Sequence, residues 1–178
     1  MKIGIISDTH DNLSGLKKAI EIFKSKEVDQ LVHCGDWVSP FTLEFFDEEM
    51  KGFKIPVRTV VGNNPGDLKR TIMRNSRMDN PIEWPKRVAL AFEVDGKKAI
   101  IFHGDDHDLL DALIASQKYD VVFTGHTHAS RNEYIGKTLV LNPGSTSFAC
   151  KGKIVDKASV AVYDSKTNKA EVITFQND

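Results

Sequence analysis

The first sixty residues alternate short apolar runs with longer amphipathic segments, and this order restricts the possible folds more than any other feature. Residues 2–7 (KIGIIS), 30–35 (QLVHCG) and 56–62 (PVRTVVG) have the length and composition of buried strands. Between them, residues 13–26 and 40–51 carry apolar side chains at helical spacing, the second segment starting with a proline. A strand–helix–strand–helix–strand order predicts parallel strands covered by helices.

The rest of the chain changes toward antiparallel structure. The predicted elements are a helix that begins near residue 66, a hairpin at 87–104, a helix at about 107–118, a strand at 119–125, and β-rich segments at 130–144 and 158–175. A parallel α/β half followed by an antiparallel half indicates two sheets packed on each other with helices outside. No repeat or long linker divides the chain, so we expect a single domain over residues 1–178.

Composition and charge exclude several classes of protein. The formal net charge is −1, which disfavours a protein that holds long nucleic acid by its phosphates. Cys34 and Cys150 have no paired spacing, which favours a reducing compartment over a disulfide framework. No run approaches the ~18 apolar residues of a membrane span, and the N-terminal apolar run is too short for a signal peptide. We therefore expect a soluble cytoplasmic protein without membrane partners.

Polar residues stand at five consecutive predicted strand ends, and four of these ends have a glycine directly beside the polar residue. In open α/β sheets, ligands bind beyond the carboxyl ends of the strands. Side chains two residues apart on an extended segment point to the same side, so we expect each Asp-x-His or His-x-His pair to converge. The five ends read Asp8-Thr9-His10, Gly35-Asp36, Gly62-Asn63-Asn64, His103-Gly104-Asp105 and Gly125-His126-Thr127-His128.

Aspartate, histidine and asparagine together suit a transition-metal site. Each short pattern alone is more often a turn or a capped strand end, but the set offers mixed oxygen and nitrogen ligands for Mn, Fe, Co, Ni or Zn. The candidates are too many for one tetrahedral ion and enough for two, and Asp36 is the natural bridging carboxylate. Two divalent ions held by two carboxylates stay electropositive, and a bridging hydroxide suits in-line attack on a phosphate ester.

In this order the motifs closely resemble those of the calcineurin-like metallophosphoesterases. They read SDTH, CGDW, GNN, FHG and GHTH, followed by LNPGS, and the resemblance covers about residues 1–164. The compact length is similar to the small bacterial and archaeal phosphodiesterase branch, whose fold a retromer subunit shares. The resemblance implies a four-layer αββα sandwich of two mixed β-sheets flanked by helices. It also implies hydrolysis of a small phosphodiester with two divalent ions, Mn²⁺ ahead of Ni²⁺, Co²⁺, Fe²⁺ or Zn²⁺.

The resemblance also assigns roles residue by residue. One metal ion would be held by Asp8, His10, Asp36 and His128. The other would be held by Asp36, Asn63, His103 and His126. The residues implied in catalysis are Asp36, Asn64, His103 and His126, with Asn64 also on the substrate.

Two positions depart from the family pattern. Many relatives have histidine where this chain has Asn64, and an amide cannot deliver a proton to the leaving group. Relatives often read His-Gly-His where this chain reads His103-Gly104-Asp105. Asp105 either tunes metal choice or caps the next helix, and His107 is a spare candidate acid.

Two further side chains have alternative interpretations. Trp37 either stacks on a substrate base or aryl group, or anchors its loop as a buried hydrophobe. Arg70, Arg74 and Arg77 fall on one face of the helix that follows Asn63, where they either steer an anionic substrate or form a solvated helix face. Arg70, the nearest to the predicted site, is the candidate substrate contact.

The rival to an enzyme is a non-catalytic metal-binding scaffold or protein-interaction module of the same fold. A scaffold has no reason to keep metal ligands, and all seven ligand positions are intact. A nuclease that acts on long nucleic acid is less consistent with the near-neutral charge. The edges of the C-terminal strands allow a homodimer or higher homo-oligomer.

Overall fold

The computed structural model describes residues 1–150 and 153–176. Its elements are β1 (Lys2–Ile6), α1 (Leu13–Ser25), β2 (Gln30–His33), α2 (Pro40–Glu49), β3 (Val57–Thr59), α3 (Leu68–Asn75), β4 (Ala89–Val94), β5 (Lys97–Phe102), α4 (His107–Ala115), β6 (Val121–Phe123), β7 (Arg131–Ile135), β8 (Thr138–Asn142), β9 (Ala149–Cys150), β10 (Lys153–Ile154), β11 (Lys157–Asp164) and β12 (Lys169–Gln176). Every predicted helix and strand is present, and only the short hairpin β9–β10 has no predicted counterpart.

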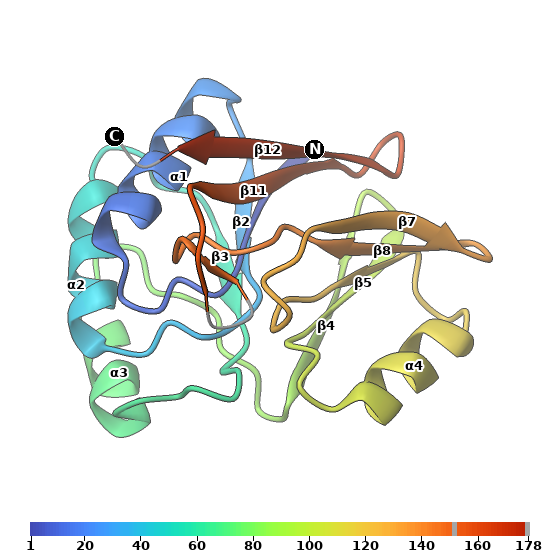
Figure 1. Cartoon of the computed structure of the whole chain (residues 1–178), viewed down its shortest axis with the longest axis horizontal. Helices are drawn as coiled ribbons and strands as arrows, with labels where there is room; N and C mark the ends of the chain where they lie inside the picture. Colours follow the sequence, from blue (N-terminus) through green and yellow to red (C-terminus); the bar gives the residue numbers. More distant parts are fainter. Residues whose placement is uncertain (151–152, 177–178) are drawn as a thin grey trace.

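The elements form four layers (Figure 1). One sheet has the strand order β12-β11-β1-β2-β3, and the other has the order β4-β5-β6-β8-β7. Helices α1, α2 and α3 lie outside the first sheet, and α4 lies outside the second (Figure 1). Both sheets mix parallel and antiparallel pairs, which confirms the predicted αββα sandwich.

The C-terminal hairpin joins the first sheet instead of extending the second. Strand β11 pairs antiparallel with β1, with Lys2 opposite Asp164 and Ile5 opposite Ala161. This pairing covers the free edge of β1, and it buries Val160 and Tyr163 completely. The predicted pair of packed, mixed sheets is observed, but the order of elements in the sequence did not indicate that the C-terminal hairpin returns to β1.

Strand β1 explains why its sequence is apolar without alternation. Ile3 and Ile5 pack between the two sheets, whereas Ile6 packs on the helix side, so both faces of the strand are buried. Gly4 also faces the helices, and a Cβ there would collide with the rings and methyls of Phe23 and Leu31. The missing side chain lets α1 lie close against the sheet.

The helices begin where the sequence supplies a cap. Asn12 accepts a hydrogen bond from the Gly15 N–H at the start of α1, and Ser39 precedes Pro40 at the start of α2. In the part of the chain that the structure describes, no helix has the length and apolarity needed to cross a membrane. Their role is to cover the sheets and fix the loops that follow β1, β2 and β3.

Candidate metal centre

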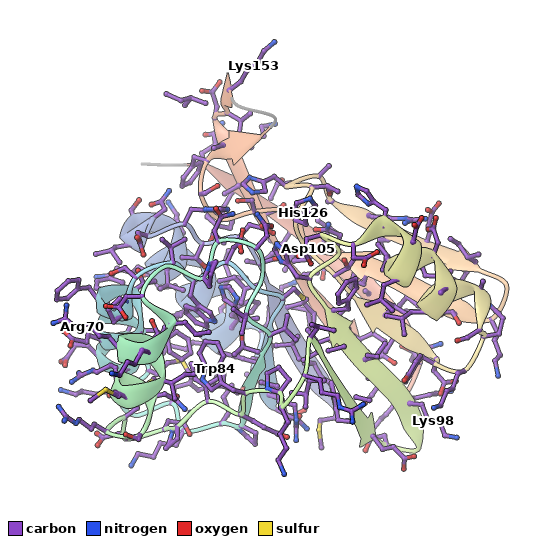
Figure 2. The ribbon with its side chains drawn as sticks, turned by 90° about the horizontal axis from the view of Figure 1, so that it is seen from below. Arg70, Trp84, Lys98, Asp105, His126 and Lys153 are labelled. Atoms are coloured by element: carbon purple, nitrogen blue, oxygen red, sulfur yellow. The ribbon has the colours of Figure 1, made fainter. Side chains whose placement is uncertain are left out.

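The five predicted strand ends meet at one edge of the sandwich. Figure 2 shows His126 and Asp105 together at this edge, whereas Lys98, at the start of β5, lies at the opposite end of the sheet. The sheets therefore present the loops after β1, β2, β3, β5 and β6 to a common space, as expected for parallel strands.

The backbone of these loops is left-handed at the proposed ligands. Five ligand residues have φ between 44° and 66°, namely Asp8, His10, Asp36, His126 and His128. The sequence predicted extended segments here, and that detail was wrong. Such conformations cost about 1–3 kcal/mol each in non-glycine residues and persist only where the surrounding structure enforces them, which is typical of functional sites.

Two glycines allow the loops to approach each other. Gly62 has φ of +86°, and a Cβ there would collide with the carboxylate of Asp36. A Cβ on Gly125 would collide with the side chains of Ser7 and Asp8. These glycines are therefore needed for close contact between the strand ends, as the sequence pattern indicated.

The first predicted ligand set is assembled around a buried carboxylate. His10 Nε2 lies 3.1 Å from His128 Nε2 and 3.8 Å from Asp8 Oδ1. His128 Nε2 lies 3.3 Å from Asp8 Oδ1, and His10 Nε2 lies 3.4 Å from Asp36 Oδ2. These four side chains could therefore hold one cation.

The second set lies directly beside the first. Asn63 Oδ1 is 2.9 Å from His103 Nε2 and 2.8 Å from His126 Nδ1. His103 Nε2 is 3.5 Å from Asp36 Oδ2, so the same carboxylate oxygen faces a histidine of each set. This position is the one that a bridging carboxylate requires.

Backbone carbonyls fix two of the imidazoles. His103 Nδ1 is 2.8 Å from the Cys34 carbonyl, and His128 Nδ1 is 2.6 Å from the Ala149 carbonyl. In each neutral ring, Nδ1 is then the N–H donor and Nε2 keeps its lone pair for a metal ion. Asn63 Oδ1 and His103 Nε2 would both be acceptors at 2.9 Å, an arrangement that a shared cation resolves.

One buried oxygen supports the fit of a metal directly. Asp8 is fully buried, and its Oδ1 has no hydrogen-bond partner within residues 1–150 and 153–176. Its other oxygen accepts hydrogen bonds from Ser7 Oγ (2.5 Å) and the His126 backbone N–H (3.0 Å). An unpartnered buried carboxylate oxygen is costly, and here it faces His10 and His128. The residues present therefore fit divalent metal ions.

Electrostatics keep the carboxylates ionised. Burial disfavours the charge on Asp8, but the nearby imidazoles of His10 and His128 and the hydrogen bond from Ser7 outweigh it and lower the pKa. Burial likewise opposes ionisation of Asp36, but the nearby imidazole of His103 and the hydrogen bonds from Asn64 hold its pKa below the usual value.

The imidazoles respond in the opposite direction. The close carboxylate of Asp8 raises the pKa of His128 despite partial burial. Burial opposes the charge on His103, but the close carboxylates of Asp36 and Asp8 raise its pKa overall. The centre therefore attracts cations, either protons or metal ions.

Asn64 lies against the predicted bridging residue. Its backbone N–H donates to Asp36 Oδ1 at 2.8 Å, and its side-chain Nδ2 donates to Asp36 Oδ2 at 2.7 Å. The amide nitrogen carries a second hydrogen that this contact does not use. Asn64 thus positions the carboxylate and retains one donor.

Trp37 is buried beneath the centre and is not exposed to a substrate. It is 2% exposed, stacks on His33 with ring centroids 3.7 Å apart, and donates from Nε1 to Thr59 Oγ1 at 2.9 Å. This environment corresponds to the loop-anchoring alternative, because the indole packs inside the protein and has no surface for a substrate.

His33 is fully buried between two loops of the site. Its Nδ1 accepts the Gly35 N–H at 3.1 Å, so in the neutral ring Nε2 is the donor to Thr9 Oγ1 at 2.8 Å. Burial lowers the pKa of His33 to about 3, so the ring is neutral at ordinary pH. His33 is a core histidine with both ring nitrogens satisfied, and it ties the loop after β1 to the end of β2.

The second departure from the family pattern, Asp105, and the spare candidate acid His107 lie at the start of α4. Asp106, not Asp105, caps α4 by accepting from the Leu109 N–H at 2.9 Å, so the capping alternative for Asp105 is wrong. His107 is exposed, with its ring 6.1 Å from that of His126. It therefore lies at the rim of the centre.

Arg70 lies apart from the metal-ligand cluster. It is exposed on α3, away from His126 (Figure 2), and its ion-pair partner is Asp67 at 3.9 Å. The structure groups it with Arg74 and Arg77 in a pocket between α2 and α3. Arg70 and Arg74 belong to α3, but Arg77 lies in the turn after the helix ends at Asn75, so the prediction of one helix face for all three was wrong. A contact between Arg70 and the centre is not observed.

The sequence did not identify the residues that support the centre from β8. Asn142 donates from Nδ2 to the Gly125 carbonyl at 2.6 Å, and Ser145 donates from Oγ to the Asp8 carbonyl at 2.8 Å. Both residues belong to the LNPGS segment, which was recognised as a motif but had no predicted role. The Ala149 carbonyl on His128 is a backbone group and gave no signal.

Comparisons with known proteins agree with this geometry. The calcineurin-like phosphoesterase superfamily domain matches residues 1–168. Phosphodiesterase MJ0936 of Methanocaldococcus jannaschii is 34% identical over 179 residues, which are 99% of this chain and 100% of that protein. A solved archaeal phosphodiesterase superposes with a TM-score of 0.83 at 33% identity, covering 98% of this chain and 100% of its own. Vps29 of Entamoeba histolytica with zinc reaches 0.65 at 14% identity over 99% of both chains, a likeness of fold alone.

Proposed function

The chain belongs to the calcineurin-like phosphoesterase superfamily, a family of metal-dependent hydrolases, and we propose that it is a phosphodiesterase with two divalent ions. The observation that carries this proposal is the convergence of seven ligand side chains from five strand ends around Asp8 and Asp36, with one Asp8 oxygen left unpartnered. The phosphodiesterase named among its relatives, matched over its whole length, supports a diester as the substrate.

We assign the ligands as two overlapping sets. One ion would be held by Asp8, His10, Asp36 and His128, and the other by Asp36, Asn63, His103 and His126. When bound, such a pair of ions supplies a nucleophile from water at neutral pH and positive charge for the phosphoryl oxygens. The mixed oxygen and nitrogen donors suit Mn²⁺ first, with Ni²⁺, Co²⁺, Fe²⁺ and Zn²⁺ as alternatives.

The side chains around the ligands orient them and stabilise the charge that develops on the substrate. Asp36 holds both sets in register, and Asn64 fixes its carboxylate through two hydrogen bonds. The second hydrogen of the Asn64 amide is available to a phosphoryl oxygen of the substrate, where it would stabilise developing charge. His103 faces the side-chain oxygens of Asn63 and Asp36, and His126 faces that of Asn63. These two histidines contribute to catalysis by positioning those oxygens.

The substrate is expected to be a small phosphodiester with a good leaving group. Asn64 cannot donate a full proton, because an amide does not titrate in the accessible pH range. Esters whose leaving oxygen needs no protonation should therefore react fastest, and kcat should fall steeply as the leaving-group pKa rises. A rate nearly independent of leaving-group pKa would contradict this assignment.

Hydrolysis of a chromogenic diester beside its monoester tests the proposal. Metal-stripped protein receives Mn²⁺, Ni²⁺, Co²⁺, Zn²⁺ or Mg²⁺ in turn, and Asp36→Asn serves as the control. Diester turnover that requires metal and disappears in the variant would support two-ion catalysis and identify the preferred ion. Binding of two ions without turnover would support a metal-binding scaffold, and failure to bind any ion would overturn the metal assignment.

A further inference from the structure

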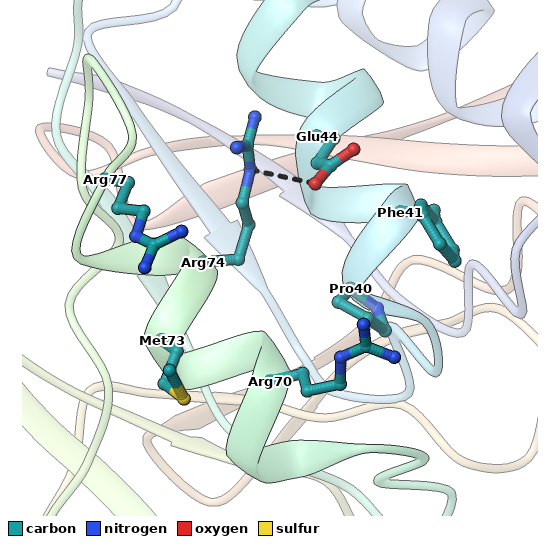
Figure 3. A pocket seen from close by; sticks show the side chains of 7 residues that line it. All are labelled: Pro40, Phe41, Glu44, Arg70, Met73, Arg74 and Arg77. Atoms are coloured by element: carbon teal, nitrogen blue, oxygen red, sulfur yellow. Dashed lines mark ion pairs between the residues drawn. The ribbon is translucent and has the colours of Figure 1, made fainter.

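A second pocket lies outside the metal centre, between α2 and α3 (Figure 3). Its cavity volume is about 280 Å³. The residues that line it are Pro40, Phe41 and Glu44 from α2 and Arg70, Met73, Arg74 and Arg77 from the α3 segment. Neither the proposed hydrolysis nor the metal ligands account for this grouping.

The pocket carries an excess of positive charge. Three guanidinium groups and one carboxylate line the pocket. The carboxylate, that of Glu44, pairs with Arg74 at 3.4 Å. Arg70 has only a 3.9 Å contact to Asp67, and Arg77 has no ionic partner within residues 1–150 and 153–176. Figure 3 shows Arg70 beside Pro40 at one end, Arg77 at the other, and Arg74 reaching to Glu44 between them.

One of the arginines is partly exposed, but its Nε atom is shielded and has no hydrogen bond. The Nε of Arg74 is shielded from solvent and has no hydrogen-bond partner in the described part of the chain, because the 3.4 Å ion pair lacks hydrogen-bond geometry. Clustered like charges repel one another, and a bound polyanion would relieve this. Arginine matches phosphate particularly well, since its planar fork donates two parallel hydrogen bonds.

The walls of the pocket are apolar and accessible. Phe41 is 66% exposed and Met73 is 51% exposed, although both are large hydrophobic side chains. An exposed aromatic ring next to arginines is suited to stack on a planar base, since base stacking on aromatic side chains tolerates any base. Phosphate recognition and base stacking are therefore offered by one pocket.

We propose that the pocket between α2 and α3 binds a nucleoside diphosphate, with the phosphates on Arg74 and Arg77 and the base on Phe41. The ligand would be partly exposed, because the cavity lies near the small end of the usual range for ligand sites. Binding here does not depend on metal ions, since none of the lining residues is a proposed metal ligand.

Isothermal titration calorimetry of the full chain in chelator tests this site, because removal of metal silences the other centre as a phosphate ligand. The probes are ADP, inorganic pyrophosphate and adenosine. We expect ADP to bind more tightly than pyrophosphate and adenosine to bind weakest. If ADP shows no binding up to about 1 mM, the proposal is wrong.

Variants separate a built site from general surface charge. Arg77→Glu is expected to weaken ADP binding about tenfold or more. Lys69→Glu makes the same charge change on α3 outside the pocket lining and should weaken it less than about twofold. Equal losses in the two variants would show only nonspecific attraction and would overturn the proposal.

The aromatic wall has its own test. Phe41→Ala should weaken ADP about fivefold while it leaves pyrophosphate binding within about twofold. Phe41 is exposed, so circular dichroism should show an intact fold. An equal loss for ADP and pyrophosphate would remove the base-stacking part and with it the nucleotide assignment.

Discussion

The two sheets contribute different chemistry to the metal centre. The loops that follow β1, β2 and β3 in the first sheet supply both carboxylates, the Asn63 amide and one imidazole. The loops that follow β5 and β6 in the second sheet supply three imidazoles and no charge-bearing oxygen. The first sheet therefore provides the negative charge that attracts cations, and the second provides neutral donors that complete the two sets.

This division has a structural consequence. Neither sheet alone holds a complete ligand set, since His128 approaches Asp8 and His103 approaches Asp36 across the sandwich. The centre can exist only when the sheets are packed on each other. Metal binding and sheet packing should therefore stabilise one another.

The largest expected effect follows from the carboxylate side. Asp36→Asn should reduce metal-dependent kcat/KM by about 10³-fold or more, because it removes a negative charge shared by both ligand sets. His126→Ala removes one neutral donor from one set and should cost less, about 10–100-fold. Steady-state kinetics over a range of metal concentrations measures both losses.

One outcome would contradict the division of roles between the two sheets. A larger loss from His126→Ala than from Asp36→Asn would show that the imidazole side controls the centre. Circular dichroism of both variants is the control for folding.

The second expected effect is stabilisation by metal. An ion present at about 1,000 times its dissociation constant should add about 4 kcal/mol to the free energy of unfolding. The reason is that its ligands come from both sheets and converge only in the folded chain. For a chain of this size, each kcal/mol corresponds to roughly 2–4 °C in Tm. Differential scanning calorimetry with and without chelator measures the shift.

The same calorimetry on Asp36→Asn provides the control. The shift should shrink strongly in this variant, which lacks the residue common to both sets. A full metal-induced shift in Asp36→Asn would mean that the ions bind elsewhere.

A third prediction concerns the support beneath the first-sheet ligands. His33 has a folded pKa of about 3, well below its value of 6.5 in an unfolded chain. Between these values the unfolded chain takes up the proton, so the stability contributed by neutral His33 is complete above pH 6.5 and falls as the pH decreases. The loss should be up to about 1.4 kcal/mol per pH unit.

Urea unfolding of metal-free protein between pH 6.5 and pH 4.5 measures this slope. His33→Asn should flatten it, whereas His107→Asn, at an exposed position, should retain it. The carboxylates do not interfere in this window, since the lowered pKa values of Asp8 and Asp36 confine their effect to lower pH. An unchanged slope in His33→Asn would show that His33 is not protonated on unfolding.

The sequence predicted the strand ends well because each followed a distinct apolar run. Asp8, Asp36 and His103 come directly after such runs, and parallel topology brings them to one edge. The sequence did not predict that the ligand residues are left-handed, since φ of Asp8 or His126 depends on contacts made by other loops. Local patterns contain no such information.

Other predictions from the sequence failed because the features concerned depend on tertiary packing. Trp37 follows a ligand in sequence, yet its indole turns inward to His33 and Thr59, where it gains both stacking and a hydrogen bond. The return of β11 to β1 depended on which strand had an open edge, which no local pattern reveals.

The smallest predicted effect concerns Asn64. This residue lies on the first-sheet side of the centre and cannot deliver a proton to the leaving group. Asn64→His would place a titratable group beside Asp36, and Asn64→Ala would remove the amide without adding one. We expect Asn64→His to raise kcat/KM for an alkyl diester relative to a p-nitrophenyl diester by about tenfold, because only the alkoxide needs a proton to leave. Asn64→Ala should not raise this ratio. Kinetics across leaving groups of graded pKa measures it, and an equal ratio in wild type and Asn64→His would mean that a donor already exists, for which the rim residue His107 would be the first candidate.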